Sequence, residues 1–422
     1  TGIVAFGPDP RNGDILLCDL AAGQVKRLVA SASGGQPLPP TLAETGAFSD
    51  LATLTPHAGI VAYAPNVNFW SDHAIKRRWF SVPEVTQTMG FSRDAPWSFP
   101  EGTVWIKHFD LELERGNPGS ARRVETRFLV KTAAGSYGAT YVWDEAQTNA
   151  TLVASEGLDM HFEILDGGVA RTQDWRVPGR ADCITCHTPA AGHALSFTTR
   201  QLNRDYPIAG GASRNQIRAL EEMGYLDAPV PDRHTLPWHA PGDDTTQSLE
   251  SRVRAYLEVN CVQCHLPGGS APNTWDARAS VPLTETRLLH GILNNSGTDA
   301  GNRLVVPGDV DHSMLLLRLR GGPGLNRMPP LATSELDEAA VDLITAWIQS
   351  EATDFQTYAE WQVAQFGSTN HSLAGRDIDA DSDFADNELE FLTGTDPNDI
   401  QDVWRLGVGA RDGLVRVTFD RA

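Results

Sequence analysis

Two short motifs with the same spacing each combine two thiols with an imidazole. They are CITCH at residues 183–187 and CVQCH at residues 261–265, and they hold four of the five cysteines in the chain. Thiols separated by two residues can add to the two vinyl groups of a porphyrin, and the histidine that follows is then placed to bind the iron. The pattern predicts two covalently bound haem groups, held by Cys183, Cys186 and His187 and by Cys261, Cys264 and His265.

Zinc binding and dithiol redox chemistry are the alternative interpretations of paired cysteines. Cys186 and Cys261 are about 75 residues apart, whereas two zinc-binding pairs are usually separated by about 15–20 residues. Neither zinc nor a thioredoxin-like dithiol needs a histidine after each pair, and no βαβ pattern surrounds either motif. The fifth cysteine, Cys18, lies in an apolar segment and is predicted to be a buried free thiol in a strand.

The surroundings of the second motif predict two helices and a second iron ligand. Apolar periodicity predicts a helix over residues 249–260, directly before Cys261, and another over 334–348 with Ser334 as its N-cap. Between them Met328 precedes two prolines, which keep the segment extended. A thioether there suits the second axial position of the iron, although methionines also fill gaps in cores. The order of helix, CxxCH, Met-Pro-Pro and helix resembles the small monohaem cytochrome c fold.

The first haem has no such segment after His187. A Ser-x-x-Gln capping box predicts a helix from Ser213 to Gly224. The possible distal ligands are His108, His193, Met223, His234 and His239, of which His108 is preferred for its place in GTVWIKHFDLELE. The other possibility is an open or water-bound position, where iron can bind peroxide or oxygen.

The sequence pattern in the first half of the chain predicts β-strands. Residues 1–31 read as VAF, DILLCDL and VKRLV joined by turns, which predicts a β-hairpin. Further strands are predicted within 78–82, 103–114, 122–132 and 138–144, as parts of a β-sandwich or a similar fold. Aromatic residues in 68–80 are interpreted as strand-core packing rather than as a carbohydrate platform.

Alternate aspartates near the end of the chain predict a calcium site. Counting from Asp377, acidic residues occupy the first, third, fifth, seventh and twelfth positions of a loop like that of the EF-hand. The predicted ligands are Asp377, Asp379, Asp381, Asp383 and Glu388. Ser382 stands where the EF-hand loop has glycine, and the alternative is a solvated acidic linker. The segment resembles the calcium-binding repeats of thrombospondin type 3 and dockerin-like linkers of secreted bacterial proteins.

Composition excludes some classes of partner. The formal charge is −20, from 54 acidic and 34 basic residues, which argues against nucleic acid and against an anionic membrane surface. No run of about 18 apolar residues exists, so no membrane span is expected. The sequence carries no signal for a particular oligomeric state.

An ordered set of phrases resembles a known family, the bacterial di-haem c-type cytochromes. In these a β-domain, two CxxCH segments and a cytochrome c domain follow one another, often behind a propeller like that of PQQ-dependent sugar dehydrogenases. The phrases span residues 40–350: NFWSDHAIKRRWF, FPEGTVWIKHFDLELE, RRVETRFLV, CITCHTPAAG, TRQLNRD, RVRAYLEVNCVQCHLPGG, and VPGDVDHSMLLLRL with RMPPL. The hairpin at 1–31 resembles the last propeller blade, which implies a chain that begins partway through a longer polypeptide.

The expected fold is multi-domain, with a β-sandwich-like domain followed by mainly α-helical cytochrome c haem domains and a calcium-binding loop. The expected segments are a blade-like hairpin at 1–31, a β-rich domain at 40–180, a first haem segment at 181–245, a cytochrome c domain with the second haem at 246–352, a linker with the calcium loop at 353–400, and the start of a β segment at 401–422.

The resemblance implies electron transfer between a donor, such as a fused PQQ-type dehydrogenase domain, and an external redox partner. The higher-potential exit is expected at the haem of His265 and Met328. A di-haem peroxidase or oxygenase with an open first haem is the alternative, and a carbohydrate-binding surface protein is a third interpretation. Covalent haem attachment implies a periplasmic or extracellular location, because its machinery works on the outer face of the cytoplasmic membrane.

Overall fold

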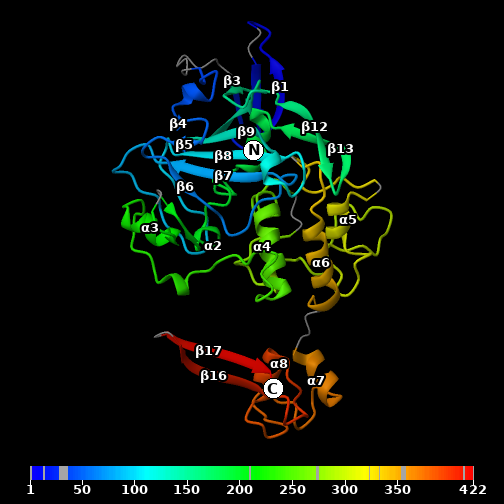
Figure 1. The fold of residues 1–422 in the computed structure, drawn as a ribbon. Helices are drawn as coiled ribbons and strands as arrows, with labels where there is room; N and C mark the ends of the chain where they lie inside the picture. The colour runs from blue at the N-terminus through cyan, green and yellow to red at the C-terminus, as the bar shows by residue number, and fades with distance from the viewer. Residues whose placement is uncertain are drawn as a thin grey trace.

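The computed structural model describes residues 2–12, 15–27, 37–208, 211–271, 275–322, 324–331, 333–352, 358–411 and 414–421. Strands account for 27% of the structure and eight helices for 21%. The expectation of mainly α-helical haem domains is therefore wrong. The reason is visible in Figure 1, where long irregular segments connect the helices of the second half of the chain.

A six-stranded antiparallel sheet forms the centre of the fold. Its strands are β6 Val61–Tyr63, β7 Ile75–Ser81, β8 Val104–Glu112, β9 Ala121–Thr132, β10 Gly135–Trp143 and β11 Ala150–Leu152. They lie side by side in chain order, from β6 at one edge to β11 at the other. Such a meander needs only local connections, and each strand alternates its side chains between the two faces.

The two faces of this sheet pack against different parts of the chain. On one face Trp79, Ile106 and Tyr141 form a core with the segment that precedes the sheet, which includes Leu42 and Phe48.

On the other face Phe80 and Trp105 pack with Phe197 and Leu202, which follow the first CxxCH motif. The first motif is therefore positioned by the sheet.

The remaining strands form small separate sheets. They are β1 Ile3–Pro8, β2 Ile15–Asp19 and β3 Gln24–Arg27; β4 Phe48–Asp50 and β5 Thr55–Pro56; β12 Leu158–Asp166 and β13 Val169–Val177; β14 Asp205–Tyr206 and β15 Arg214–Asn215; and β16 Trp404–Arg411 and β17 Leu414–Arg421. The expected β-sandwich is wrong, because the described strands form one six-stranded sheet and several separate sheets of two or three strands instead of two sheets of similar size.

The helices are α1 Arg180–Cys186, α2 Thr199–Leu202, α3 Gln216–Glu222, α4 Leu249–Cys261, α5 Met314–Arg320, α6 Glu338–Ser350, α7 Tyr358–Phe366 and α8 Asn387–Thr393. Helices α4 and α6 lie side by side below the sheet in Figure 1. Val253 and Leu257 of α4 share a core with Ile344 and Trp347 of α6. This helix pair supports the second motif.

Two predicted helix starts are wrong by a few residues. Helix α6 is capped by Asp337, whose side chain accepts a hydrogen bond from the amide of Ala340, and not by Ser334. Helix α3 is capped by Asn215 and not by Ser213. In both cases a carboxylate or amide oxygen nearer the helix satisfies the free amides of the first turn.

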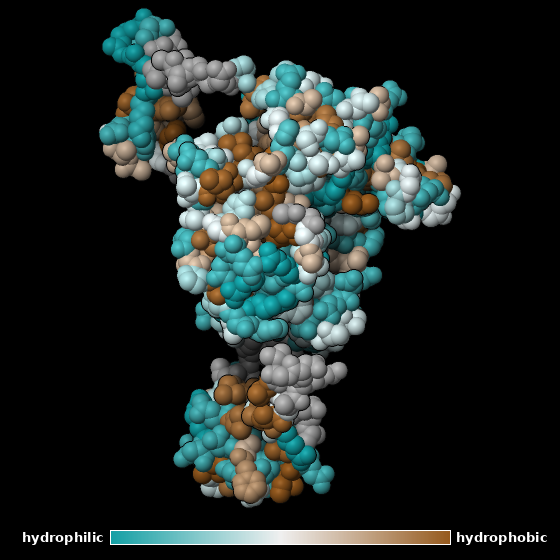
Figure 2. All heavy atoms as spheres, turned by 60° about the vertical axis from the view of Figure 1, so that its left-hand side comes forward, coloured by the Kyte–Doolittle hydropathy of each residue, from teal (hydrophilic) through white to brown (hydrophobic). Residues whose placement is uncertain are grey.

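The terminal sheets leave apolar side chains exposed. Val4, Phe6 and Val25 of the first sheet and Val408 and Val415 of the last are more than half exposed, and brown surface is visible on the lobes at the top and bottom of Figure 2.

The prediction of a buried Cys18 is wrong: Cys18 lies in β2 but is exposed, because no described layer covers that sheet. The predicted strand end at residues 28–31 lies outside the described residues. Within the described ranges, no helix combines the length and apolarity that crossing a membrane requires.

Helix α1 packs on strand β10 at a position that only glycine can occupy. A Cβ added at Gly138 would lie 2.4 Å from Cys183 Sγ and 2.8 Å from Cys183 Cβ. These distances are shorter than any van der Waals contact, so the missing side chain lets the first motif approach the sheet.

Replacement of Gly138 by Ala should lower the free energy of unfolding by about 1–3 kcal/mol, because the added methyl group overlaps Cys183. Chemical denaturation measures the effect. Gly7→Ala is the matched control, since Gly7 also lies in a strand and a Cβ there meets nothing within 4 Å. Equal stability of the two variants would show that α1 does not depend on this contact.

Candidate functional site

The first CxxCH motif lies on the face of the central sheet that carries Phe80 and Trp105. Cys183 and Cys186 belong to α1, and His187 is the residue that ends this helix. All three line a cavity of about 160 Å³. The opposite wall is formed by sheet residues that include Tyr63, Arg78, Trp105, Lys107, Arg127 and Leu129.

His187 is held with one ring nitrogen free for a ligand. Its Nδ1 lies 2.5 Å from the carbonyl oxygen of His193. A carbonyl oxygen only accepts hydrogen bonds, so Nδ1 carries the proton and Nε2 has a free lone pair. Burial lowers the pKa of His187 to about 4, so the ring is neutral at pH 7. Metal-binding histidines are oriented in the same way, by a bond from the second ring nitrogen.

The second motif lines a larger cavity of about 360 Å³. Cys261 is the last residue of α4, and Cys264 and His265 follow it in the same wall. The His265 ring lies 5.0 Å from the Trp275 ring, and burial lowers the pKa of His265 to about 4. The cavity volume falls within the range of about 300–1,000 Å³ that is usual for ligand pockets.

Met328 lines the same cavity as His265, together with Pro329 and Pro330. Its amide donates a hydrogen bond of 3.0 Å to the carbonyl of Arg318 in α5, which ties the segment to the helix. Leu304, Leu315 and Leu319 contribute apolar surface to the cavity. The structure thus brings the predicted thioether ligand to the site of the second motif.

The two motifs meet although they are far apart in the sequence. The thiols of Cys186 and Cys264 interact with each other, which lowers the pKa of Cys264 and raises that of Cys186. Thr185 beside Cys186 lines the second cavity, and Leu331 beside Pro330 lines the first. The two cavities therefore adjoin each other.

Neither alternative interpretation of the cysteines fits this geometry. A tetrahedral zinc site needs its ligand atoms close together, but among the described residues only the aspartates discussed below form a group that could share one ion. The thiol contact also joins the two motifs, whereas a redox dithiol pairs the thiols within one motif.

The structure does not bring His108, the preferred distal ligand, to the first cavity. His108 is fully buried on the opposite face of the sheet, where its ring nitrogens bond Thr126 Oγ1 at 2.8 Å and Asp110 Oδ1 at 3.0 Å. Its neighbour Lys107 faces the first cavity instead. The cause is the alternation of side chains along a strand, which sends adjacent residues to opposite faces.

The other distal candidates also lie away from the wall that faces His187. The carbonyl of His193 orients His187, while His234 lies in a short 3-10 helix and Met223 is 38% exposed at the end of α3. His239 is buried beside Glu258, at 3.4 Å. Among the described residues that line the first cavity, His187 is the only histidine and no methionine is present.

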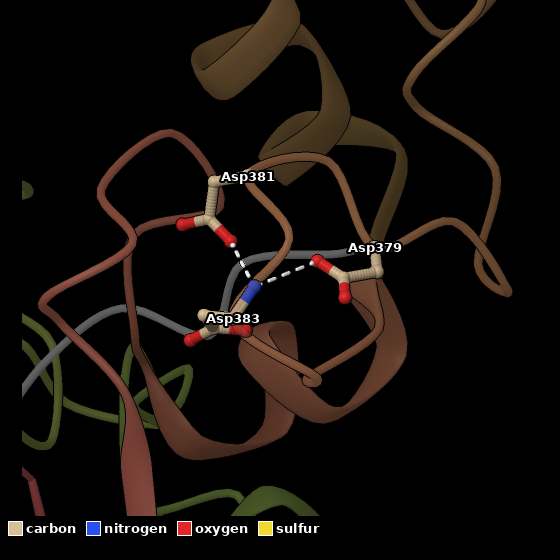
Figure 3. A group of neighbouring side chains, drawn as sticks. All are labelled: Asp379, Asp381 and Asp383. Atoms are coloured by element: carbon tan, nitrogen blue, oxygen red, sulfur yellow. Dashed lines mark hydrogen bonds between the residues drawn. The ribbon is translucent and has the colours of Figure 1, made fainter.

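The acidic loop forms a cluster, but with a different set of residues from the predicted one. Carboxylate oxygens of Asp379, Asp381 and Asp383 lie within 4.8 Å of one another. Figure 3 shows the first two turned toward the backbone amide of Asp383, which donates to an Oδ1 atom of each at 3.2 Å.

Glu390, and not Glu388, is the glutamate whose pKa the three aspartates affect, although it lies outside the group that they form. Glu390 is fully buried, and neither of its carboxylate oxygens has a hydrogen-bond partner. Burial and the three aspartates raise the pKa of Glu390 to about 8. Glu388 is half exposed and pairs with Arg376 at 2.7 Å.

The group is therefore shifted by two residues from the predicted loop frame, and Asp377 is not part of it. Counted from Asp379, Glu390 is the twelfth residue and Phe384 is the sixth. Phe384 has φ +78°, the left-handed conformation that favours glycine at this position of an EF-hand loop. Both frames end on an acidic residue in the sequence, so the pattern alone could not separate them.

Comparisons with protein-family models, with curated proteins and with solved structures give no match for this chain.

Proposed function

We propose that the chain is a di-haem electron-transfer protein. The observation that carries the proposal is the pair of CxxCH motifs, each lining a cavity and each joined to the other by a thiol contact. Both histidines are partly buried, and burial lowers the pKa of each to about 4, so both are neutral at pH 7, the state in which imidazole binds a metal. The resemblance of the sequence to di-haem c-type cytochromes supports the same function.

Cysteines and histidines of the chain would hold the two haem groups in different ways. The thiols of Cys183 and Cys186, and those of Cys261 and Cys264, would form the thioether links. His187 and His265 would bind the irons, and the haem groups would supply one-electron redox chemistry. Apolar walls around the second site keep water away, which is one means of tuning its potential.

The residues around the two sites suggest the direction of electron flow. A Met thioether as second ligand raises the reduction potential relative to a second His. The site of His265 and Met328 would therefore be the exit. Each transferred electron oxidises the donor, such as a PQQ-type dehydrogenase domain, by one equivalent and reduces an external redox protein by one. A periplasmic or extracellular location follows from covalent attachment.

A second candidate function is a peroxidase or oxygenase reaction at the first site. It is favoured by the absence of a second histidine or methionine among the described residues that line that cavity. Reduction of peroxide consumes two electrons and two protons and yields two waters, with the electrons arriving one at a time through the second site. A high-spin ferric signal that shifts on adding cyanide would favour this function, and two low-spin signals would favour the carrier.

We also propose that Asp379, Asp381, Asp383 and Glu390 bind Ca²⁺. Oxygen ligands from carboxylates are those that Ca²⁺ prefers, and a glutamate at the twelfth position binds through both oxygens in EF-hand loops. A buried carboxylate without partners destabilises the folded chain, and a divalent cation removes that cost. The ion would tie α8 to the loop before it.

A pyridine haemochrome assay on the purified chain should find two haem groups. The double variant Cys183→Ala and Cys186→Ala should retain one, and so should Cys261→Ala with Cys264→Ala, because each motif holds its own group. Fewer than two haem groups in the unaltered chain would contradict the proposed function.

Replacement of Met328 by Ala should abolish the weak near-infrared band of a sulfur-to-iron bond. It should also lower one midpoint potential by on the order of 100 mV, since the axial ligand is a main determinant of potential. Met223→Ala is the control, because Met223 lies outside both cavities. If the band and both potentials are unchanged, Met328 is not a ligand.

Addition of Ca²⁺ should raise the melting temperature of the chain, and Glu390→Gln should remove most of that rise. The stabilisation is about 2.7 kcal/mol at a free Ca²⁺ concentration of 100 times Kd. Glu388→Gln is the matched control and should respond like the unaltered chain, because Glu388 is paired with Arg376. An equal loss in both variants would contradict the assignment of Glu390.

A further inference from the structure

Three basic residues form a row across the sheet face that lines the first cavity. Arg78 of β7 is paired in register with Lys107 of β8, and Lys107 is paired with Arg127 of β9. All three line the cavity that contains Cys183 and His187. Like charges at directly opposite positions of neighbouring strands destabilise a sheet. The row therefore needs an explanation.

Two of the three lack a counter-ion. Arg78 is 6% exposed; its Nη1 donates to Asn68 Oδ1 at 3.1 Å, and its Nη2 is buried without a hydrogen-bond partner. The Lys107 ammonium lies 5.1 Å from the centroid of the Phe69 ring and 5.0 Å from that of Phe109, and no described residue forms a hydrogen bond or ion pair with it.

The third basic residue, Arg127, is paired with a nearby carboxylate. Arg127 forms a two-armed ion pair with Glu125, which is fully buried and also accepts a hydrogen bond from Trp175 Nε1 at 3.1 Å. Asp182, which also lines the cavity, pairs with Arg176 at 3.5 Å, so among the described residues Glu125 is the one carboxylate paired with a cation of the row. Burial and the neighbouring cations lower the pKa of Lys107, as expected where the anion that would balance it is missing.

We propose that the first cavity binds a carboxylate between Arg78 Nη2 and Lys107 Nζ, beside His187. A guanidinium and an ammonium that converge on one space match the charge and the hydrogen-bonding geometry of a carboxylate. This carboxylate could come from two sources. One is a propionate of the first haem, and for this source the proposal rests on the proposed function. The other source is a free small carboxylate, which would be a substrate or an effector of that site.

Variants of the full haem-loaded chain separate these sources. The variants are Arg78→Gln and Lys107→Gln, with Arg78→Lys to restore the charge. Lys131→Gln is the control, since Lys131 lies in β9 of the same sheet but does not line the cavity. The measurements are the midpoint potential of each haem and the response of the spectrum and melting temperature to sodium acetate, with sodium chloride as the reference salt.

A bound propionate predicts that the first potential falls in Arg78→Gln and Lys107→Gln, returns in Arg78→Lys, and that acetate has no saturable effect. A free carboxylate predicts saturable acetate binding that weakens at least tenfold in both Gln variants. The melting-temperature measurement needs no haem, so it tests the site even if the haemochrome assay contradicts the proposed function.

Two results would overturn the proposal. One is that neither the potentials nor the acetate response differ from those of Lys131→Gln. The other is a change from low-spin to high-spin iron in Lys107→Gln alone, which would make Lys107 an iron ligand and not an anion-binding residue.

Discussion

The contact of helix α1 with strand β10 is the constraint on which the site depends. Because Gly138 has no side chain, Cys183 lies directly against the strand, and His187 lines the cavity on the sheet together with Cys183. Cys186 is the last residue of the helix, and its thiol interacts with that of Cys264 in the second motif. One contact between a helix and a sheet therefore positions the first cavity and brings the second beside it.

Alternation within strands limited what could be predicted about the first cavity. The strands around 78–82, 103–114, 122–132 and 138–144 could be predicted, because their apolar and β-branched residues are dense, and observed strands overlap most of each segment. Which face looks toward the motif could not be predicted. Trp105 and Phe109 on one face are as apolar as Ile106 on the other, so nothing local distinguishes the direction of Lys107 from that of His108.

Long-range contacts explain the other differences. The amides of Ser334 and Glu335 bond the buried carboxylate of Asp72, a residue far away in the sequence, so Ser334 does not begin the helix. In the acidic loop, Arg376 pairs with Glu388 and leaves Glu390 to be buried beside the aspartates. Local spacing describes both loop frames equally well, and only the packing of the side chains chooses between them.

The two cavities differ in charge, and this difference bears on the direction of electron flow. Uncompensated cations near an iron stabilise the reduced form, because the added electron offsets positive charge. If both sites hold haem as proposed, Arg78 and Lys107 would therefore raise the first potential, as the Met328 thioether would raise the second. A carboxylate bound between Arg78 and Lys107 would cancel their effect on the first potential. It would leave the effect of Met328 on the second potential unchanged. On the proposed di-haem function, electron flow from the first site to the second would thus depend on whether an anion occupies the row of basic residues.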